Sequence, residues 1–221
     1  MLAKDLISDT IPALHTSDTA ITALNWMEIF KISHLPIVNN KELLGLISDV
    51  DIYDLNNPEE AVGNHELSLT RPFVYQNQHI YEVIEIVSRL KLTVIPVLNE
   101  DKEFLGLINL NDLLHYFSSL MAIQNPGGII IIELNVNDYS LSEIAQIIET
   151  NDAKILSLYI DSHPDTMKLN ITIKINKSDL TSILQTFERY NYNIKATFME
   201  NNELDDLYKD RYDSFIKFLD I

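Results

Sequence analysis

The chain of 221 residues contains no cysteine, five glycines and a single tryptophan. Without cysteine there are no disulfides and no thiolate chemistry, which fits a reducing compartment. No glycine-rich phosphate loop and no serine in a nucleophile elbow occurs. No apolar run, Ile129–Ile132 being among the longest, could cross a bilayer, and the first residues have no apolar signal core. We therefore expect a cytoplasmic, non-enzymatic protein with no membrane partner.

Basic residues are also scarce. Lysine and arginine number 16 against 33 aspartates and glutamates, which gives a net charge of −17. This charge repels phosphate backbones at long range, so we expect no nucleic-acid partner. It also disfavours highly phosphorylated ligands unless a nearby basic side chain or a metal compensates. The content of 46% apolar and 22% charged residues is typical of a globular protein.

Metal-binding patterns are missing as well. The six histidines are scattered singly, and no pair has the spacing of zinc ligands. Asp49, Asp51 and Asp54 are spaced like an acidic metal loop, but they lack the glycine and the distal glutamate of a calcium loop. We expect no metal site, and among the histidines only His34, beside Pro36, is a candidate cleft residue.

What the chain does contain is an internal repeat. His34–Val38 and the following Gly45–Ile52 recur about sixty residues later as Val94–Leu98 and Gly106–Leu113. The two copies align without a gap until one extra residue in the second turn. Matched polar starts and matched apolar spacing predict the same helix, two strands and second helix in each copy. The expected elements are helices near 18–32, 49–55, 81–91 and 111–123, and strands near 35–38, 43–48, 93–98 and 104–108.

A different pattern follows Asn125–Gly128, where proline and glycine predict a boundary. Alternating apolar residues in Lys168–Ile175 indicate a sheet with one face covered by helices. A helical stripe at 204–219 needs a partner, either this chain or a second subunit. Between these segments the expected order is βαββαβ, with strands at 129–136, 153–160, 168–175 and 193–198 and helices at 140–150 and 177–190.

The proline and Gly45–Asp51 motifs, with their second copies, resemble a tandem pair of cystathionine-β-synthase (CBS) domains. Residues 129–200 resemble an ACT domain in element order, and the whole is similar to CBS-ACT regulatory proteins of the acetoin-utilisation type. The resemblance implies an α/β fold in which a CBS pair precedes a ferredoxin-like ACT-like domain and a C-terminal helix. The implied domains are CBS domain 1 at 1–62, CBS domain 2 at 63–124, a hinge at 125–128, the ACT-like domain at 129–200 and a helical tail at 201–221.

The resemblance further implies a disc with two clefts, which in many relatives hold adenosine-containing ligands. The family pattern of glycine, two apolar residues, a hydroxyl residue, two variable residues and aspartate places Ser48 and Asp51 in the first cleft. In the second copy Asn109 replaces the hydroxyl residue and Asp112 is retained. The remaining candidate ligand-binding residues are Leu14, His34, Leu35, Pro36 and Ile37 in the first cleft, and Val94 and Pro96 in the second.

The chemistry of these residue types suits a nucleoside. A strand that ends at Ile47 and a helix that opens near Asp49 leave unpaired backbone N–H groups beside the cleft. Asp51 can accept two hydrogen bonds from a ribose diol, and Ser48 can bond a ribose or phosphate oxygen. The apolar Leu14, Leu35 and Ile37 would cover the base. The alternative is that both aspartates only cap helices.

No basic residue follows either aspartate, which favours a ligand with little phosphate, such as AMP or S-adenosylmethionine, over ADP or ATP. None of these regulatory ligands is an obligatory cofactor. In the ACT-like part, Asn137–Leu141 contains no glycine, which favours pairing in a homodimer over a pocket for a small zwitterion.

We thus expect a ligand-sensing regulatory homodimer that acts on the ACT-like domain or on another protein partner. The alternative is a ligand-free scaffold that joins partner proteins, its clefts filled by Phe73, Tyr75 or Tyr53. A metal-dependent phosphohydrolase would need clustered carboxylates and histidines, and the sequence offers none.

Overall fold

The computed structural model describes residues 1–55, 57–64, 70–162 and 167–199. The chain divides into two compact units, and the boundary lies between Tyr116 and Phe117. Within the described residues no helix is long and apolar enough to span a membrane.

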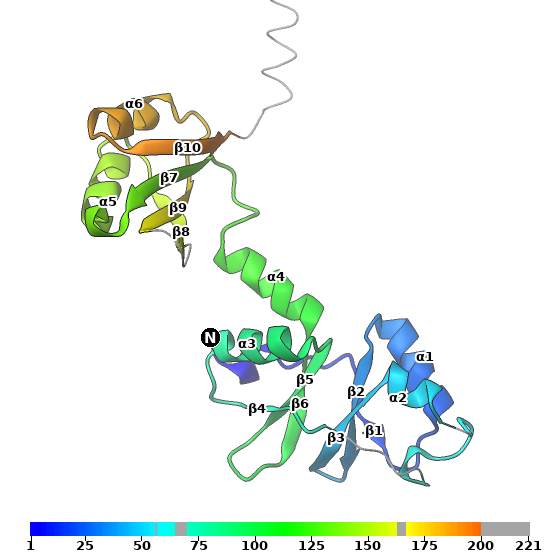
Figure 1. Ribbon diagram of the computed structural model, residues 1–221. Coiled ribbons are helices and arrows are strands. Elements are labelled where there is room, and N and C mark those ends of the chain that lie inside the picture. The colour runs from blue at the N-terminus through cyan, green and yellow to red at the C-terminus, as the bar shows by residue number, and fades with distance from the viewer. Residues whose placement is uncertain (56, 65–69, 163–166, 200–221) are drawn as a thin grey trace, which may run out of the picture. The chain divides into compact units, whose positions relative to one another are not determined.

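The first repeat forms one small sheet with two helices (Figure 1). Helix α1 begins after Thr19, whose hydroxyl accepts a hydrogen bond from the Thr22 amide, and it ends where Lys31 adopts a left-handed conformation. The notable neighbour of this cap is Asp18, whose carboxylate accepts the His15 amide at 2.7 Å, so the helix predicted near 18–32 starts two residues later. The elements are β1 (Leu14–His15), α1 (Ala20–Phe30), β2 (His34–Asn39), β3 (Glu42–Ser48) and α2 (Asp49–Tyr53).

The second repeat has the same elements in the same order. His79 caps α3 at the position that Thr19 holds for α1, and Lys91 ends α3 in the left-handed conformation of Lys31. Gln78 accepts the Tyr75 amide as Asp18 accepts that of His15. The elements are β4 (Val74–Tyr75), α3 (Ile80–Leu90), β5 (Val94–Leu98), β6 (Phe104–Asn109) and α4 (Leu110–Leu120).

The register of the two sheets also repeats. The order is β1-β2-β3 in one and β4-β5-β6 in the other, each with a parallel pair followed by an antiparallel pair. Pro36 lies opposite Leu46 and Pro96 opposite Leu107, and a bulge follows Ile37 and Val97. The predicted duplication is therefore confirmed down to strand register.

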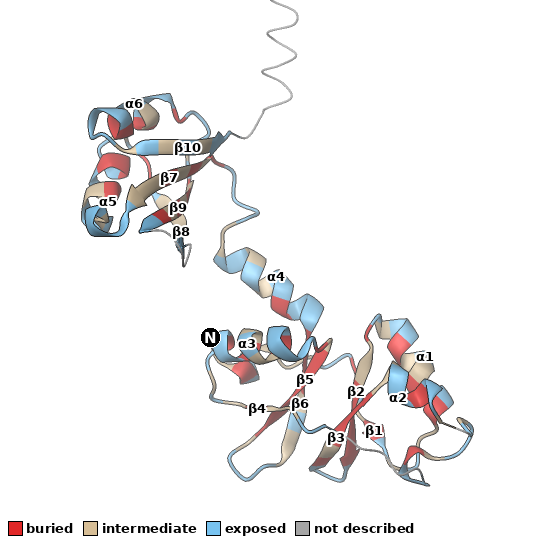
Figure 2. Ribbon diagram, in the orientation of Figure 1, coloured by how far each residue is buried: buried red, intermediate tan, exposed pale blue. Residues whose placement is uncertain are grey.

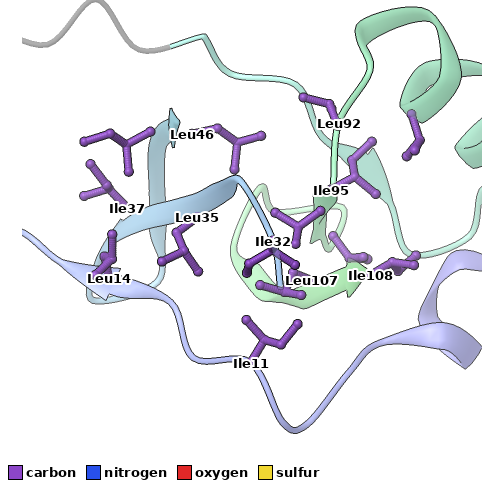
Figure 3. Close-up of a cluster of buried hydrophobic side chains, with 14 of the residues drawn as sticks. Ile11, Leu14, Ile32, Leu35, Ile37, Leu46, Leu92, Ile95, Leu107 and Ile108 are labelled. Carbon is purple, nitrogen blue, oxygen red and sulfur yellow. The ribbon is translucent and has the colours of Figure 1, made fainter. Parts of the chain in front are cut away.

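A single hydrophobic core joins the two repeats. Figure 3 shows Leu35 and Ile37 of β2 and Leu46 of β3 in the same cluster as Ile95 and Leu107 of the other sheet. The N-terminal segment, with the short helix η1 (Ala3–Leu6), packs on this core, as does η2 (Val62–Asn64). Gly106 is needed here because a Cβ atom at this position would lie 2.4 Å from the Ile7 side chain. Figure 2 shows the buried residues concentrated on the central strands.

The second unit has the predicted βαββαβ order. Its antiparallel sheet has the strand order β10-β7-β9-β8, and the apolar side chains of both helices pack with those of alternate strand residues in one core. The helix expected at 204–219 lies outside the described residues. The elements are β7 (Ile129–Asn135), η3 (Val136–Asp138), α5 (Leu141–Glu149), β8 (Ile155–Ser162), β9 (Lys168–Ile175), α6 (Thr181–Arg189) and β10 (Asn193–Phe198).

The glycines of the predicted hinge are tied into this second unit. Gly128 donates to the Lys177 carbonyl and accepts from the Ile175 amide. A Cβ atom on Gly127, whose φ is +137°, would lie 1.9 Å from the Ile175 carbonyl oxygen. These bonds anchor 127–128 beside the end of the central strand β9, and a hinge at 125–128 stays a prediction.

Candidate ligand-binding cleft

A cavity of about 310 Å³ lies where the first repeat meets the second. The first repeat contributes the start of β2, the end of β3 and the start of α2. The second contributes the segment before β4 and the end of α3. The lining residues are His34, Leu46, Ser48, Asp51, Thr70, Pro72, Leu90 and Leu92.

Ser48 and Asp51 form the polar end of this cavity through a reciprocal helix cap. The Ser48 hydroxyl accepts the Asp51 amide at 3.2 Å, and the Asp51 Oδ2 atom accepts the Ser48 amide at 2.8 Å and its hydroxyl at 2.7 Å. Asp51 thus does cap the helix, which was the predicted alternative to ligand binding. Since both of these bonds to the Asp51 carboxylate use Oδ2, the cap leaves Oδ1 as an acceptor on a residue that lines the cavity.

His34 lies opposite Ser48 in the register of β2 and β3. Its Nδ1 atom is 3.0 Å from the hydroxyl of Thr93 and accepts the Thr93 amide at 3.4 Å. The same hydroxyl accepts the amide of Ser33 at 2.9 Å. A residue of the second repeat therefore holds the histidine ring of the first.

The electrostatics of the cavity are set by acidic groups. Burial of the ring lowers the pKa of His34 below its ordinary value, and the nearby Asp49 and Asp51 act in the opposite direction. The neutral form of the ring is therefore favoured by burial. No lysine or arginine is among the described residues that line the cavity, although Arg71 and Lys91 adjoin lining residues in the sequence. This wall repels a polyphosphate and tolerates a neutral or cationic ligand.

The matching junction of the second repeat is built with different atoms. The Asp112 amide donates to the Asn109 side-chain oxygen at 2.8 Å, and the Asn109 side-chain amide donates to the Asp112 carboxylate at 2.5 Å. Asn109 is buried, whereas Ser48 is only partly buried. The two polar positions predicted from the family motif are thus paired with each other in both repeats.

Several candidate residues predicted for the base lie elsewhere. Leu14, Leu35 and Ile37 are buried in the shared core and are not among the lining residues of this cavity. Pro36, and Val94 and Pro96 of the second repeat, are also buried. Because strand side chains alternate, the residues of β2 that face the core cannot also face the cleft. The apolar wall consists instead of Leu46, Pro72, Leu90 and Leu92.

Sequence reasoning missed Thr70, Pro72, Leu90 and Leu92 because they belong to the other repeat. One signal could have identified Pro72. It aligns with Pro12, so the entry segment of each repeat occupies an equivalent place. The aromatic residues considered as plugs do not line the cavity. Phe73 and Tyr75 pack on a small separate cluster, and the Tyr53 side chain is exposed.

The second unit has a cavity of about 450 Å³ at the end of β7. Its lining includes Asp138, Glu143 and Glu133. Lys168 is ion-paired to Glu133 at 2.6 Å, and this hydrogen bond lowers the pKa of the Glu133 carboxyl. Burial, followed by a hydrogen bond to Glu143, raises the pKa of the Tyr192 hydroxyl. Among the described residues of this lining, the lysine is already paired, so they offer the carboxylate of an amino acid no unpaired cation. Across the described residues, no group of three acidic or histidine side chains could hold a metal ion.

Comparison with known proteins identifies the repeated unit. The family model of the CBS domain matches the chain twice, at residues 3–56 and 66–119. The predicted tandem CBS architecture is thereby confirmed, whereas the acetoin-type and ACT resemblances stay predictions. An inosine-5'-monophosphate dehydrogenase from Methanocaldococcus jannaschii is 22% identical over 176 residues, which are 78% of this chain and 34% of the relative. The chain thus spans about a third of that relative's length.

Two solved structures have a similar fold. A CBS domain pair/ACT domain protein from Thermotoga maritima is 21% identical, with a TM-score of 0.48 over 54% of this chain and 98% of the other. CBSX2 in complex with AMP is 17% identical, with a TM-score of 0.46 over 53% of this chain and 96% of the other.

Proposed function

We propose, on the premise that residues 3–56 and 66–119 are two CBS domains in tandem, that this protein is a non-enzymatic, cytoplasmic sensor of an adenosine-containing ligand. The observation that carries the proposal is the first cleft, where His34, Ser48 and Asp51 line the same cavity. Its apolar wall suits a flat base, and the polar end offers a carboxylate and backbone donors to a sugar.

Size and charge narrow the ligand class. A cavity of about 310 Å³ is at the small end of ligand pockets, which span roughly 300–1,000 Å³. The carboxylate of Asp51 stands in the cavity without a lysine or arginine among the described lining residues. We therefore rank AMP and S-adenosylmethionine above ADP and ATP.

The response is a population shift. The lining residues come from both repeats, so a bound ligand restrains one repeat against the other. Helix α4 continues from the first unit into the second, and it provides a covalent route by which a change in the CBS pair reaches the second unit or a protein partner.

A thermal-melt screen with AMP, ADP, ATP, S-adenosylmethionine and dinucleotides tests the proposal. A ligand at a hundred times its Kd raises the free energy of unfolding by about 2.7 kcal/mol. We expect a clear rise in Tm with AMP or S-adenosylmethionine and a smaller one with ATP. No shift with any member of the panel would contradict the sensor function and leave the scaffold alternative.

We also propose a homodimer. Tyr53 and Leu114 hold matched positions in the two repeats, and their side chains are 74% and 64% exposed. Large apolar residues repeated on one helix position in both repeats suit a two-fold contact with a second copy of this chain. Light scattering on the full chain should give twice the monomer mass, and the double variant Tyr53→Glu, Leu114→Glu should give the monomer mass. A monomeric parent chain would overturn this proposal.

A further inference from the structure

The side chain of His34 has one ring nitrogen, Nε2, that forms no hydrogen bond within the part of the chain that the structure describes. The Thr93 amide can only donate, and it points to Nδ1, so Nδ1 must carry a lone pair. The Thr93 hydroxyl accepts from the Ser33 amide, which leaves its own hydrogen for the same Nδ1 atom. In the neutral ring the proton therefore lies on Nε2.

No described residue makes a hydrogen bond to the Nε2 atom of His34. The ring is partly buried and belongs to a residue that lines the cavity, so we infer that this N–H donor is within reach of a ligand bound there. A donor kept from water gains most when a ligand supplies the acceptor. The second repeat has Val94 at the matching position and offers no such donor.

The position of His34 selects which ligand atom it reaches. It pairs across the strands with Ser48, and Ser48 is bonded to Asp51 at the polar end of the cavity. If this end holds the ribose, the donor lies beside the sugar edge of the base. In a purine nucleoside the ring acceptor next to the glycosidic bond is N3.

We propose that Thr93 positions His34 so that its Nε2–H group donates to N3 of a bound purine nucleoside and makes the first cleft selective for that acceptor. This inference rests on the proposed adenosine-type ligand. Thr93 acts through His34 and does not line the cavity, so it is a positioning residue.

The test is titration calorimetry on the full chain with AMP, 3-deaza-AMP and 1-deaza-AMP. Each analogue replaces one ring nitrogen by C–H. We expect 3-deaza-AMP to bind the parent chain about tenfold more weakly than AMP, the effect of one well-placed hydrogen bond, and more weakly than 1-deaza-AMP. This comparison needs no variant, so it does not depend on the folding of any substituted chain.

Variants then locate the donor. His34→Val, which copies the residue of the second repeat, should bind AMP about tenfold more weakly and lose the preference for AMP over 3-deaza-AMP. His34→Gln should keep part of the preference because its amide can donate. Thr93→Val should reduce the ratio of the affinity for AMP to the affinity for 3-deaza-AMP. Thr93→Ser, which keeps the hydroxyl, should restore this ratio. His115→Val, at an exposed position of α4, is the matched control and should behave as the parent.

The role of His34 and the sensor function are contradicted by different results. If the parent binds AMP but does not distinguish 3-deaza-AMP, or if His34→Val keeps the preference, the role of His34 is wrong and the sensor function stands. If the parent binds no member of the nucleotide panel, both are wrong.

Discussion

The two CBS repeats share one structural frame, which consists of the same sheets, strand register and helix ends. They differ in the polar residues near the junctions where a strand is followed by a helix. Prolines, glycines and buried apolar residues occupy matched positions and give the same sheets, the same register and the same helix ends. At the strand-to-helix junctions, however, Ser48 is matched by Asn109, and on the neighbouring strands His34 is matched by Val94. The shared frame is thus determined by residues that pack in the core, whereas the proposed ligand binding depends on a few polar positions outside it.

The same comparison suggests how the second cleft is lined. Residues matched to the described lining are Val94, Leu107, Asn109 and Asp112, with Thr10, Pro12, Phe30 and Ile32 from the other repeat. Phe30 stands where the first cleft has Leu90, and Val94 where it has the neutral donor of His34. We therefore expect the second cleft to be narrower and a weaker ligand site.

The largest predicted effect concerns the shared frame. Ile47 and Ile108 are matched and both are almost fully buried in the common core. Ile47→Ala and Ile108→Ala should each lower the free energy of unfolding by about 2–5 kcal/mol, because each leaves a cavity. Urea unfolding of the parent chain and of each variant measures this loss in the free energy of unfolding. A large cost in one repeat and none in the other would break the equivalence of the two frames.

The next largest effect is on AMP binding, which we expect to depend on the aspartate of the first junction and not on that of the second. Asp51→Asn should weaken AMP binding by about a hundredfold, since it removes the charge from a carboxylate proposed to accept two hydrogen bonds from the ribose. Asp112→Asn, the matched control, should leave AMP binding at the first cleft unchanged. Because both aspartates also complete helix caps, replacement by alanine should cost about 0.5–2 kcal/mol of stability in either repeat. Asparagine keeps an acceptor for the cap, so it separates the two roles.

A junction swap sharpens the same contrast. Ser48→Asn gives the first junction the residue of the second, and Asn109→Ser does the reverse. Since serine and asparagine cap helices about equally well, we expect stability changes within about 0.5 kcal/mol. AMP affinity should fall about tenfold for Ser48→Asn, which loses the hydroxyl, and should not fall for Asn109→Ser. Equal affinities for the parent and Ser48→Asn would remove Ser48 from the site.

The smallest effect is the pH dependence that His34 adds to the first repeat. Burial lowers its pKa in the folded chain, so the unfolded chain binds the proton first as the pH falls. The stability contributed by the neutral ring is complete above the ordinary value of 6.5 and is lost as the pH falls from there through the folded pKa. Asp49 and Asp51 oppose this effect.

Urea unfolding at about pH 7.5 and about pH 5.5 measures the loss. The difference between the two free energies should be smaller for His34→Val than for the parent chain, while His115→Val should match the parent. The same difference in all three chains would show that the ring of His34 does not resist protonation.

Much of the fold follows from local patterns in the sequence. The alternation in Lys168–Ile175 predicted β9 to the residue, and Asn193–Phe198 matched β10. Helix α6 was predicted from Lys177 but begins at Thr181, because the Asp179 side chain accepts the Thr181 amide and holds the preceding turn. Local capping chemistry of this kind is the part that periodicity does not resolve.

The candidate site was predictable only in part. The motif predicted Ser48 and Asp51, and the position beside Pro36 predicted His34; all three line one cavity. The residues predicted to cover the base do not line this cavity, because a sequence alone does not distinguish core from cleft positions such as Leu35 and Ile37. The contact from Thr93 to His34 joins residues 59 positions apart and has no local signal in the sequence.

Titration calorimetry of AMP into the parent chain, Asp51→Asn and Asp112→Asn tests the central claim most directly. The account predicts strong binding at one site per chain, its loss in Asp51→Asn and its retention in Asp112→Asn. No binding to the parent chain, or an equal loss in both variants, would contradict it.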